Sequence, residues 1–146
     1  MRLISGVPNA PTPAGHYSQA VVHDGVVYVA GQVGGDPTGK DPGPGTIEVQ
    51  TERALRNVET ILKAAGSGLD HLLQITLYVT DITLWAQVNA VFTRVLGAHK
   101  PARAVVPVKD FKGGMQLEIV CVAAVAPRRS ARKTAKPARS RARRKR

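Results

Sequence analysis

The chain gathers its apolar residues into short β-branched runs that are separated by stretches rich in glycine and proline. Runs of this kind predict strands, whereas two other segments repeat their apolar residues at helical spacing. The expected strands cover residues 2–6, 17–23, 26–30, 69–80, 102–108 and 115–126, and the expected helices cover 46–65 and 84–96. This order predicts an α+β fold, in which a mixed sheet carries both helices on one face.

Local signals predict the ends and the buried faces of these elements. Asp24-Gly25, between two β-branched runs, predicts a tight hairpin. Thr46 is the expected N-cap of the first helix and Gly66 its end, while residues 31–45 are expected to form a loop. The residues expected to be buried are Ile47, Leu55, Val58, Ile61 and Leu62 on the first helix, and Trp85, Val88, Phe92, Val95 and Leu96 on the second. The uncovered face of the sheet needs a cover, so we expect an oligomer.

Two charged residues interrupt the last two apolar strands. Arg103 lies among alanines and valines, and Glu118 lies between leucine and isoleucine. An unpaired buried charge costs on the order of several kcal/mol, so each residue needs a partner or a function. One interpretation is a structural ion pair, or two charges on a solvated strand face. The other is a binding pocket that contains one cation and one carboxylate, and the pattern alone leaves both open.

The positive charge of the chain is confined to its end. Residues 1–126 contain ten basic and ten acidic residues, whereas residues 127–146 contain eleven basic residues and no acidic one. We expect a domain at 1–126 and a disordered tail at 127–146, because alanine and proline alone cannot offset the ordering entropy. Such a tail suits non-specific attraction to nucleic acid or another polyanion; a solubilising extension is the alternative. The candidate contacts are Arg128, Arg129, Arg132, Lys133, Arg141, Arg143 and Arg144.

Several classes of protein are disfavoured by composition. No apolar stretch reaches the length of a membrane span, and the first residues lack the apolar run of a secretory signal, so a cytoplasmic location is expected. The single cysteine, Cys121, allows no disulfide within the chain and no multi-cysteine metal site. The four histidines show no metal-ligand spacing. We therefore expect no metal.

Six short motifs occur in an order that resembles the Rid family, also called YjgF or reactive intermediate deaminase. The motifs are GHYSQA (15–20), AGQVG (30–34), RALRNVETILKAAG (53–66), VNAVF (88–92), PARAVV (101–106) and LEIVCVAA (117–124). The resemblance extends from about residue 4 to residue 125 and leaves only the tail outside. It implies a chorismate-mutase-like α+β domain that forms a homotrimer with ligand pockets between subunits. It also implies hydrolysis of 2-imino acids to 2-keto acids and ammonia, without a metal or organic cofactor.

The resemblance assigns roles to individual residues. Arg103 matches the arginine that binds the substrate carboxylate, for which a planar two-pronged donor is suited. Glu118 matches the glutamate that activates water, which is the work of a general base. Tyr17 matches a pocket tyrosine that orients this water or lines the substrate. Gly31 matches a loop position whose backbone N–H meets the ligand, and Asn89 matches a position near the pocket. Packing or purely structural hydrogen bonding remains the alternative for each residue.

Three departures from the family pattern bear on activity. The well-known deaminases usually have serine where this chain has Ala30, and often cysteine where it has Val105. His16 replaces the commoner proline before Tyr17, which removes a fixed φ angle. These changes leave Arg103 and Glu118 in place but bring a second hypothesis into view. In it, the domain binds a small carboxylate as a regulatory module and performs no turnover.

Overall fold

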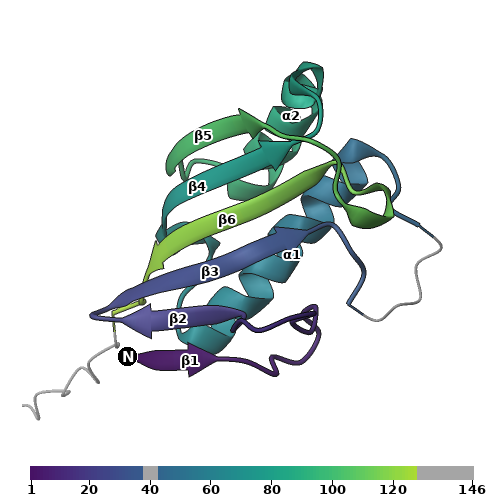
Figure 1. Cartoon of the computed structure of the whole chain (residues 1–146). Helices are drawn as coiled ribbons and strands as arrows, with labels where there is room; N and C mark the ends of the chain where they lie inside the picture. Colours follow the sequence, from purple (N-terminus) through teal and green to yellow (C-terminus); the bar gives the residue numbers. More distant parts are fainter. Residues whose placement is uncertain (38–42, 128–146) are drawn as a thin grey trace, which may run out of the picture.

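The structure is a computed structural model that describes residues 1–37 and 43–127. Six strands form one sheet in the order β1-β2-β3-β6-β4-β5 (Figure 1). All neighbouring strands are antiparallel except β4 and β5, which are parallel. The strands are β1 (Arg2–Ile4), β2 (Ala20–His23), β3 (Val26–Val33), β4 (Leu72–Val79), β5 (Ala102–Pro107) and β6 (Leu117–Ala124).

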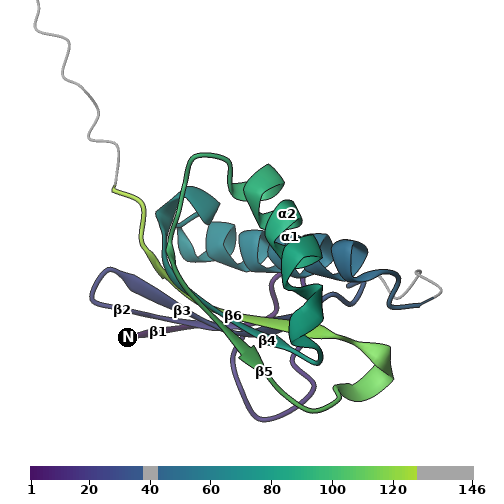
Figure 2. The same cartoon turned by 90° about the horizontal axis from the view of Figure 1, so that it is seen from above.

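Two helices, α1 (Ile47–Ala65) and α2 (Trp85–Leu96), lie together on one side of this sheet, as the turned view shows (Figure 2). Short 3-10 turns occur at Leu69–His71, Ile82–Leu84 and Lys112–Gly114. The predicted α+β order and the predicted single helical layer are therefore confirmed. Within the described residues, no helix is both long enough and apolar enough to cross a membrane. Residues 128–146, which hold the predicted basic contacts of the tail, lie outside the described residues.

The local signals at the turn and at α1 are confirmed. Asp24 and Gly25 both have positive φ, at 46° and 76°, as the tight hairpin requires. The Thr46 side chain accepts a hydrogen bond from the Val49 N–H, and Gly66 ends α1 in the left-handed conformation. All five residues predicted for the core face of α1 are buried.

Several predicted boundaries and one predicted core residue are wrong. Residues 31–33 continue β3 instead of opening the loop, residues 17–19 precede β2, and residues 69–71 form a 3-10 turn. On α2, Val88 and Phe92 are buried as predicted, but Trp85 is 46% exposed. Its indole ring contacts the guanidinium of Arg103 instead of packing into the core.

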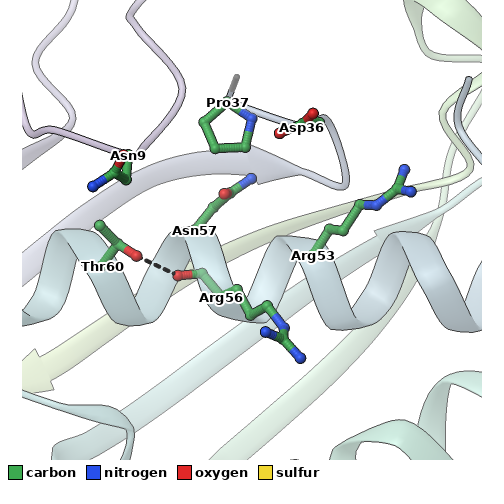
Figure 3. A pocket seen from close by; sticks show the side chains of 7 residues that line it. All are labelled: Asn9, Asp36, Pro37, Arg53, Arg56, Asn57 and Thr60. Atoms are coloured by element: carbon green, nitrogen blue, oxygen red, sulfur yellow. Dashed lines mark hydrogen bonds between the residues drawn. The ribbon is translucent and has the colours of Figure 1, made fainter. Parts of the chain in front are cut away.

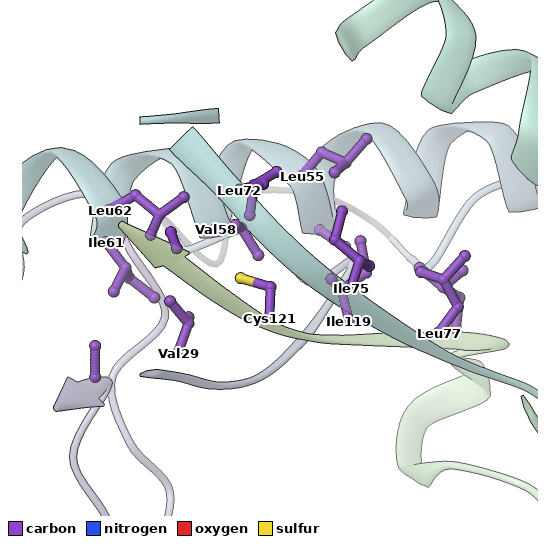
Figure 4. Close-up of a cluster of buried hydrophobic side chains, with 14 of the residues drawn as sticks. Val29, Leu55, Val58, Ile61, Leu62, Leu72, Ile75, Leu77, Ile119 and Cys121 are labelled. Carbon is purple, nitrogen blue, oxygen red and sulfur yellow. The ribbon is translucent and has the colours of Figure 1, made fainter. Parts of the chain in front are cut away.

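The core lies between the sheet and the helices. Leu55, Ile61 and Leu62 of α1 pack against Ile75 and Ile119 from the sheet (Figure 4). Cys121 joins this cluster, is 2% exposed, and burial raises the pKa of its thiol to about 12. A thiol in this state is an inert packing residue, as its position inside an apolar strand predicts.

The opposite face of the sheet carries exposed apolar side chains. Tyr28 of β3 is 49% exposed, and Leu3 of β1 and Val106 of β5 are also exposed. These residues alternate with the buried residues that face the helices, because successive side chains of a strand point to opposite faces. An apolar sheet face that its own helices do not cover is typical of an interface with another chain.

The outer face of α1 holds the loop that follows β3. The Asn57 side-chain amide donates hydrogen bonds to the carbonyls of Val33 and Gly35, and Arg53 donates to the carbonyl of Gly43. A pocket of about 360 Å³ opens here, where Asn9 and Thr60 also contribute to the lining (Figure 3). None of the five predicted site residues lies in it. The polar side chains of this face therefore support the loop.

Candidate active site

Glu118 of β6 lies against the backbone of Gly31 in β3. A methyl group placed on Gly31 would collide with the Glu118 carboxylate, reaching 2.6 Å from its Cδ and 3.2 Å from its Cγ. Only glycine therefore lets this carboxylate lie across the strand. Val33 and Tyr78 flank Glu118 on the neighbouring strands. Burial among these groups raises the pKa of the Glu118 carboxyl above its usual value, which suits a proton acceptor.

A local irregularity in β3 produces this arrangement. The register between β3 and β6 shifts between Val29 and Gln32, and such a bulge re-aims the residues within it. The buried Gln32 side chain donates hydrogen bonds to the carbonyls of Ala30 and Gly31. These hydrogen bonds from Gln32 stabilise the bulge, in which the Gly31 backbone lies against Glu118.

The GHYSQA segment is anchored by its glutamine. The buried Gln19 side chain accepts from the Val7 N–H and donates to the Pro11 carbonyl, while its backbone carbonyl accepts from Ala30 N–H. Tyr17 is 52% exposed, and its hydroxyl accepts a hydrogen bond from the Ala14 N–H. Gln19 thus ties the loop that carries Tyr17 to the strand that carries Gly31.

Arg103 of β5 lies over α2. Its guanidinium donates a hydrogen bond of 2.8 Å to the Asn89 side-chain oxygen. The same group lies 5.4 Å from the ring centre of Phe92 and 5.8 Å from that of Trp85. Cation–π contacts of this length restrain an arginine without neutralising it. Arg103 therefore keeps its positive charge and remaining N–H groups for an anion.

Trp85 and Phe92 were predicted as core residues, and neither was predicted to contact Arg103. Positions 85, 89 and 92 are spaced by four and three residues, so they follow one another along a single helix face. This shared face could have indicated that Trp85 and Phe92 lie beside Asn89 at the site, but the helical spacing was interpreted as a core face.

Arg103 and Glu118 lie on opposite faces of the sheet. Arg103 is paired with Ile75, which is paired in turn with Cys121, and both partners face the helices. Glu118 precedes Cys121 by three positions along β6, so it points to the other face. The predicted residues thus form two pairs, Arg103 with Asn89 and Glu118 with Gly31. In the described part of the chain, neither Arg103 nor Glu118 takes part in an ion pair, so the structural Arg–Glu pair is not formed within it.

The last two strands are also not neighbours in the sheet. The two strands expected at 102–108 and 115–126 follow each other in the sequence, yet β4 lies between β5 and β6. Within residues 1–37 and 43–127, no three His, Cys, Asp or Glu side chains gather as metal ligands would.

Comparison with known proteins places this arrangement in a family. The family model described as Endoribonuclease L-PSP matches residues 7–125. The chain belongs to the YjgF/RidA family. A YjgF/RidA relative from Rattus norvegicus, named 2-iminobutanoate/2-iminopropanoate deaminase, is 34% identical over 127 residues, which are 87% of this chain and 93% of that protein. The resemblance inferred from the six motifs is thereby confirmed.

Solved YjgF/RidA structures share the fold. RidA from an Antarctic Psychrobacter bacterium is 33% identical with a TM-score of 0.79, over 86% of this chain and all of that one. Escherichia coli TdcF, solved with bound serine, is 27% identical with a TM-score of 0.79 over the same shares of the two chains. The matched residues, 7–125, include strands β2 to β6 and both helices, and they end before the basic residues of 128–146.

Proposed function

We propose that the protein hydrolyses reactive 2-imino acids to 2-keto acids and ammonia. The observation that carries this proposal is the pair of unneutralised charges, one on each side of the sheet. Arg103 is oriented by Asn89 but meets no carboxylate within the described residues. Glu118 is half-buried, with a raised pKa, against Gly31. The deaminase names of relatives at about one-third identity support the same reaction.

The complete site is proposed to form between chains. Because Arg103 and Glu118 point to opposite faces, one chain cannot present both to one small substrate. β5 is an edge strand, and the exposed apolar face around Tyr28 and Val106 is available to a second copy. We propose that this assembly is a homotrimer, as the family resemblance implies, with Arg103 of one chain beside Glu118 of the next.

The chemistry follows from the two charges. Arg103 binds the substrate carboxylate through two parallel N–H···O bonds, and Asn89 fixes the plane of the guanidinium. The Glu118 carboxylate takes a proton from water as the water oxygen bonds to the imine carbon. Glu118 passes this proton to the imine nitrogen, which gives an amino alcohol. The hydroxyl proton then moves to the nitrogen as the C–N bond breaks, so ammonia leaves and the carbonyl group forms. In this scheme the Gly31 backbone borders the reacting carbon, and Tyr17 orients the water.

The test generates the imine in place, since free imines hydrolyse in water. An amino-acid oxidase acting on 2-aminobutyrate supplies 2-iminobutanoate, and semicarbazide traps the imine that escapes. The protein should divert the imine to 2-oxobutanoate and ammonia. Two charge-assisted hydrogen bonds contribute about 1.5–3 kcal/mol each, so Arg103→Ala should lower kcat/KM by roughly 10²–10⁴-fold. Undiminished turnover by that variant would rule out this role for Arg103.

A second candidate function is carboxylate binding without turnover. Ala30 offers no hydroxyl beside Gly31, and Val105 packs partly buried against the core at a position where the well-known deaminases often have cysteine. Calorimetry with 2-oxobutanoate, run beside the turnover assay, separates the two functions. Binding that requires Arg103 but not Glu118, with no ammonia released, would favour the regulatory module.

The basic tail is proposed to bind RNA independently of the pocket. The charge distribution supports this proposal: residues 127–146 contain eleven basic residues and no acidic one, whereas residues 1–126 contain equal numbers of both. The matching family is named for an endoribonuclease, so RNA is the polyanion to test first. If about six charges engage single-stranded phosphates, log K should fall with log salt at a slope of roughly −4. RNA binding that survives deletion of residues 127–146 would refute this proposal.

A further inference from the structure

A hollow of about 530 Å³ opens directly beside Arg103. It lies between the second half of α2 and the segment that enters β5, and its lining includes Thr93, Leu96, Lys100 and Arg103. No aspartate or glutamate belongs to the described lining. The hollow therefore presents two cationic side chains and no acidic one.

Neither cation is neutralised within the described part of the chain. Arg103 contacts an amide oxygen and two aromatic rings, none of which carries a full negative charge. Lys100 is exposed and takes part in none of the ion pairs formed by the described residues. Two uncompensated cations on one concave surface favour a ligand with two negative groups.

The backbone that carries Lys100 is fixed. The His99 ring is hydrogen-bonded through Nε2 to the Leu72 carbonyl at 2.8 Å, so this nitrogen carries the proton. The His99 N–H also donates to the Leu96 carbonyl. These bonds tie the turn after α2 to β4, so Lys100 projects from an anchored position.

The C-terminal end of α2 offers a competing explanation. Its dipole amounts to about half a negative charge and attracts a lysine placed after the last turn. The two side chains together supply about two positive charges, so the dipole cannot neutralise both. A purely structural Lys100 would affect stability and leave the choice between substrates unchanged, which the experiment below measures.

We propose that this hollow receives a second, distal carboxylate of the substrate. The inference rests on the proposed function and specifies its substrate class as the imines of acidic amino acids, such as 2-iminosuccinate and 2-iminoglutarate. The 2-carboxylate binds Arg103, and the distal carboxylate binds Lys100. The distal group undergoes no chemistry: water adds to the imine carbon, ammonia leaves, and the second carboxylate only selects the substrate.

The experiment compares two imines with the full-length protein. An L-aspartate oxidase supplies 2-iminosuccinate, and an amino-acid oxidase supplies 2-iminobutanoate. The kcat/KM for 2-iminosuccinate should exceed that for 2-iminobutanoate by about 10-fold or more. Lys100→Met keeps the length of the side chain and removes its charge, so it should lower that ratio by about 10–100-fold through KM. Lys100→Arg should restore most of it, and the exposed Lys112→Met serves as the matched control.

The outcomes separate this inference from the proposed function. Turnover of 2-iminobutanoate with a ratio that Lys100→Met does not change would overturn the second-carboxylate site alone. If neither imine is turned over, calorimetry with 2-oxoglutarate and 2-oxobutanoate decides. Tighter binding of 2-oxoglutarate that depends on Lys100 would support the site although the deaminase function fails, whereas equal binding would overturn the site as well.

Discussion

The Glu118 carboxylate occupies the space that a side chain on Gly31 would fill. A methyl group there would reach 2.6 Å from Cδ of Glu118. This relationship couples one glycine of β3 to the proposed general base on β6, although 87 positions separate them in the chain (118 minus 31). It also explains why the Ala30-Gly31-Gln32 segment needs glycine at its centre: the constraint is the close approach of a carboxylate.

Gly31→Ala should inactivate the protein without unfolding it. The colliding atoms belong to the far end of a flexible side chain, so Glu118 can swing away, and Gly31 is absent from the glycines with positive φ. Turnover should fall by about 100-fold or more because the base is displaced, while the melting temperature should change by only a few degrees. Gly35→Ala is the matched control, because nothing lies within 4 Å of its added methyl group.

The double variant Gly31→Ala/Glu118→Gln tests the coupling itself. If the glycine acts through the carboxylate, the double variant should be no less active than Glu118→Gln alone. Independent, multiplying losses would show that Gly31 serves the reaction in another way.

Glu118→Gln should lose activity and gain stability near neutral pH. Burial raises the Glu118 pKa, so the folded chain holds this proton more tightly than the unfolded chain. Stability therefore falls as pH rises from the unfolded pKa through the folded one. The variant avoids this loss, so its melting temperature should exceed that of the wild type by about 1–4 °C at pH 7. The difference should vanish near about pH 4.

Glu48→Gln provides a control of opposite sign. Glu48 lies in the first turn of α1, and a hydrogen bond with its own backbone, with Thr46 second, lowers its pKa. Its contribution is present above the unfolded pKa and is lost as pH falls. This variant should melt lower than the wild type at pH 7, and thermal scans of both variants at the two pH values check the pair. A lower melting temperature for Glu118→Gln at pH 7 would contradict the argument.

Much of the fold could be predicted from local patterns, whereas the arrangement of the site could not. Asp24-Gly25, Thr46 and Gly66 act through their immediate neighbours, so the hairpin and the ends of α1 could be predicted. Strand order depends on pairing between distant segments, and no local pattern places β6 between β3 and β4.

The consequence is clearest for Arg103 and Glu118. Their residue types marked them as unusual within apolar strands, but their separation onto two faces follows only from the register through Ile75 and Cys121. The prediction that Trp85 is buried was wrong for a related reason. Helical spacing cannot distinguish an aromatic residue that packs in the core from one whose ring contacts an arginine on a strand.

Asn89→Ala should weaken substrate binding more than it slows chemistry. The Asn89 side chain accepts the hydrogen bond that orients Arg103, and it lies one turn from Trp85. A hydrogen bond to a charged group contributes about 1.5 kcal/mol or more, so kcat/KM should fall by about 10-fold, mostly through KM. Gln87→Ala, exposed on the same helix, is the control. An effect confined to kcat would instead place Asn89 in the chemical step.

The composite site predicts that two inactive variants restore activity when they are mixed. The Arg103→Ala chain keeps Glu118, and the Glu118→Gln chain keeps Arg103. An interface between these two chains can therefore contain both native residues. When equal amounts are unfolded and refolded together, random assembly gives each interface an intact pair with a probability of about one quarter. Activity should therefore return to roughly a quarter of the wild-type value, and the Arg103→Ala/Glu118→Gln double variant, mixed with either single variant, should stay inactive. A mixture that forms mixed oligomers, detected by native mass spectrometry of a tagged chain, yet remains inactive would refute the composite site.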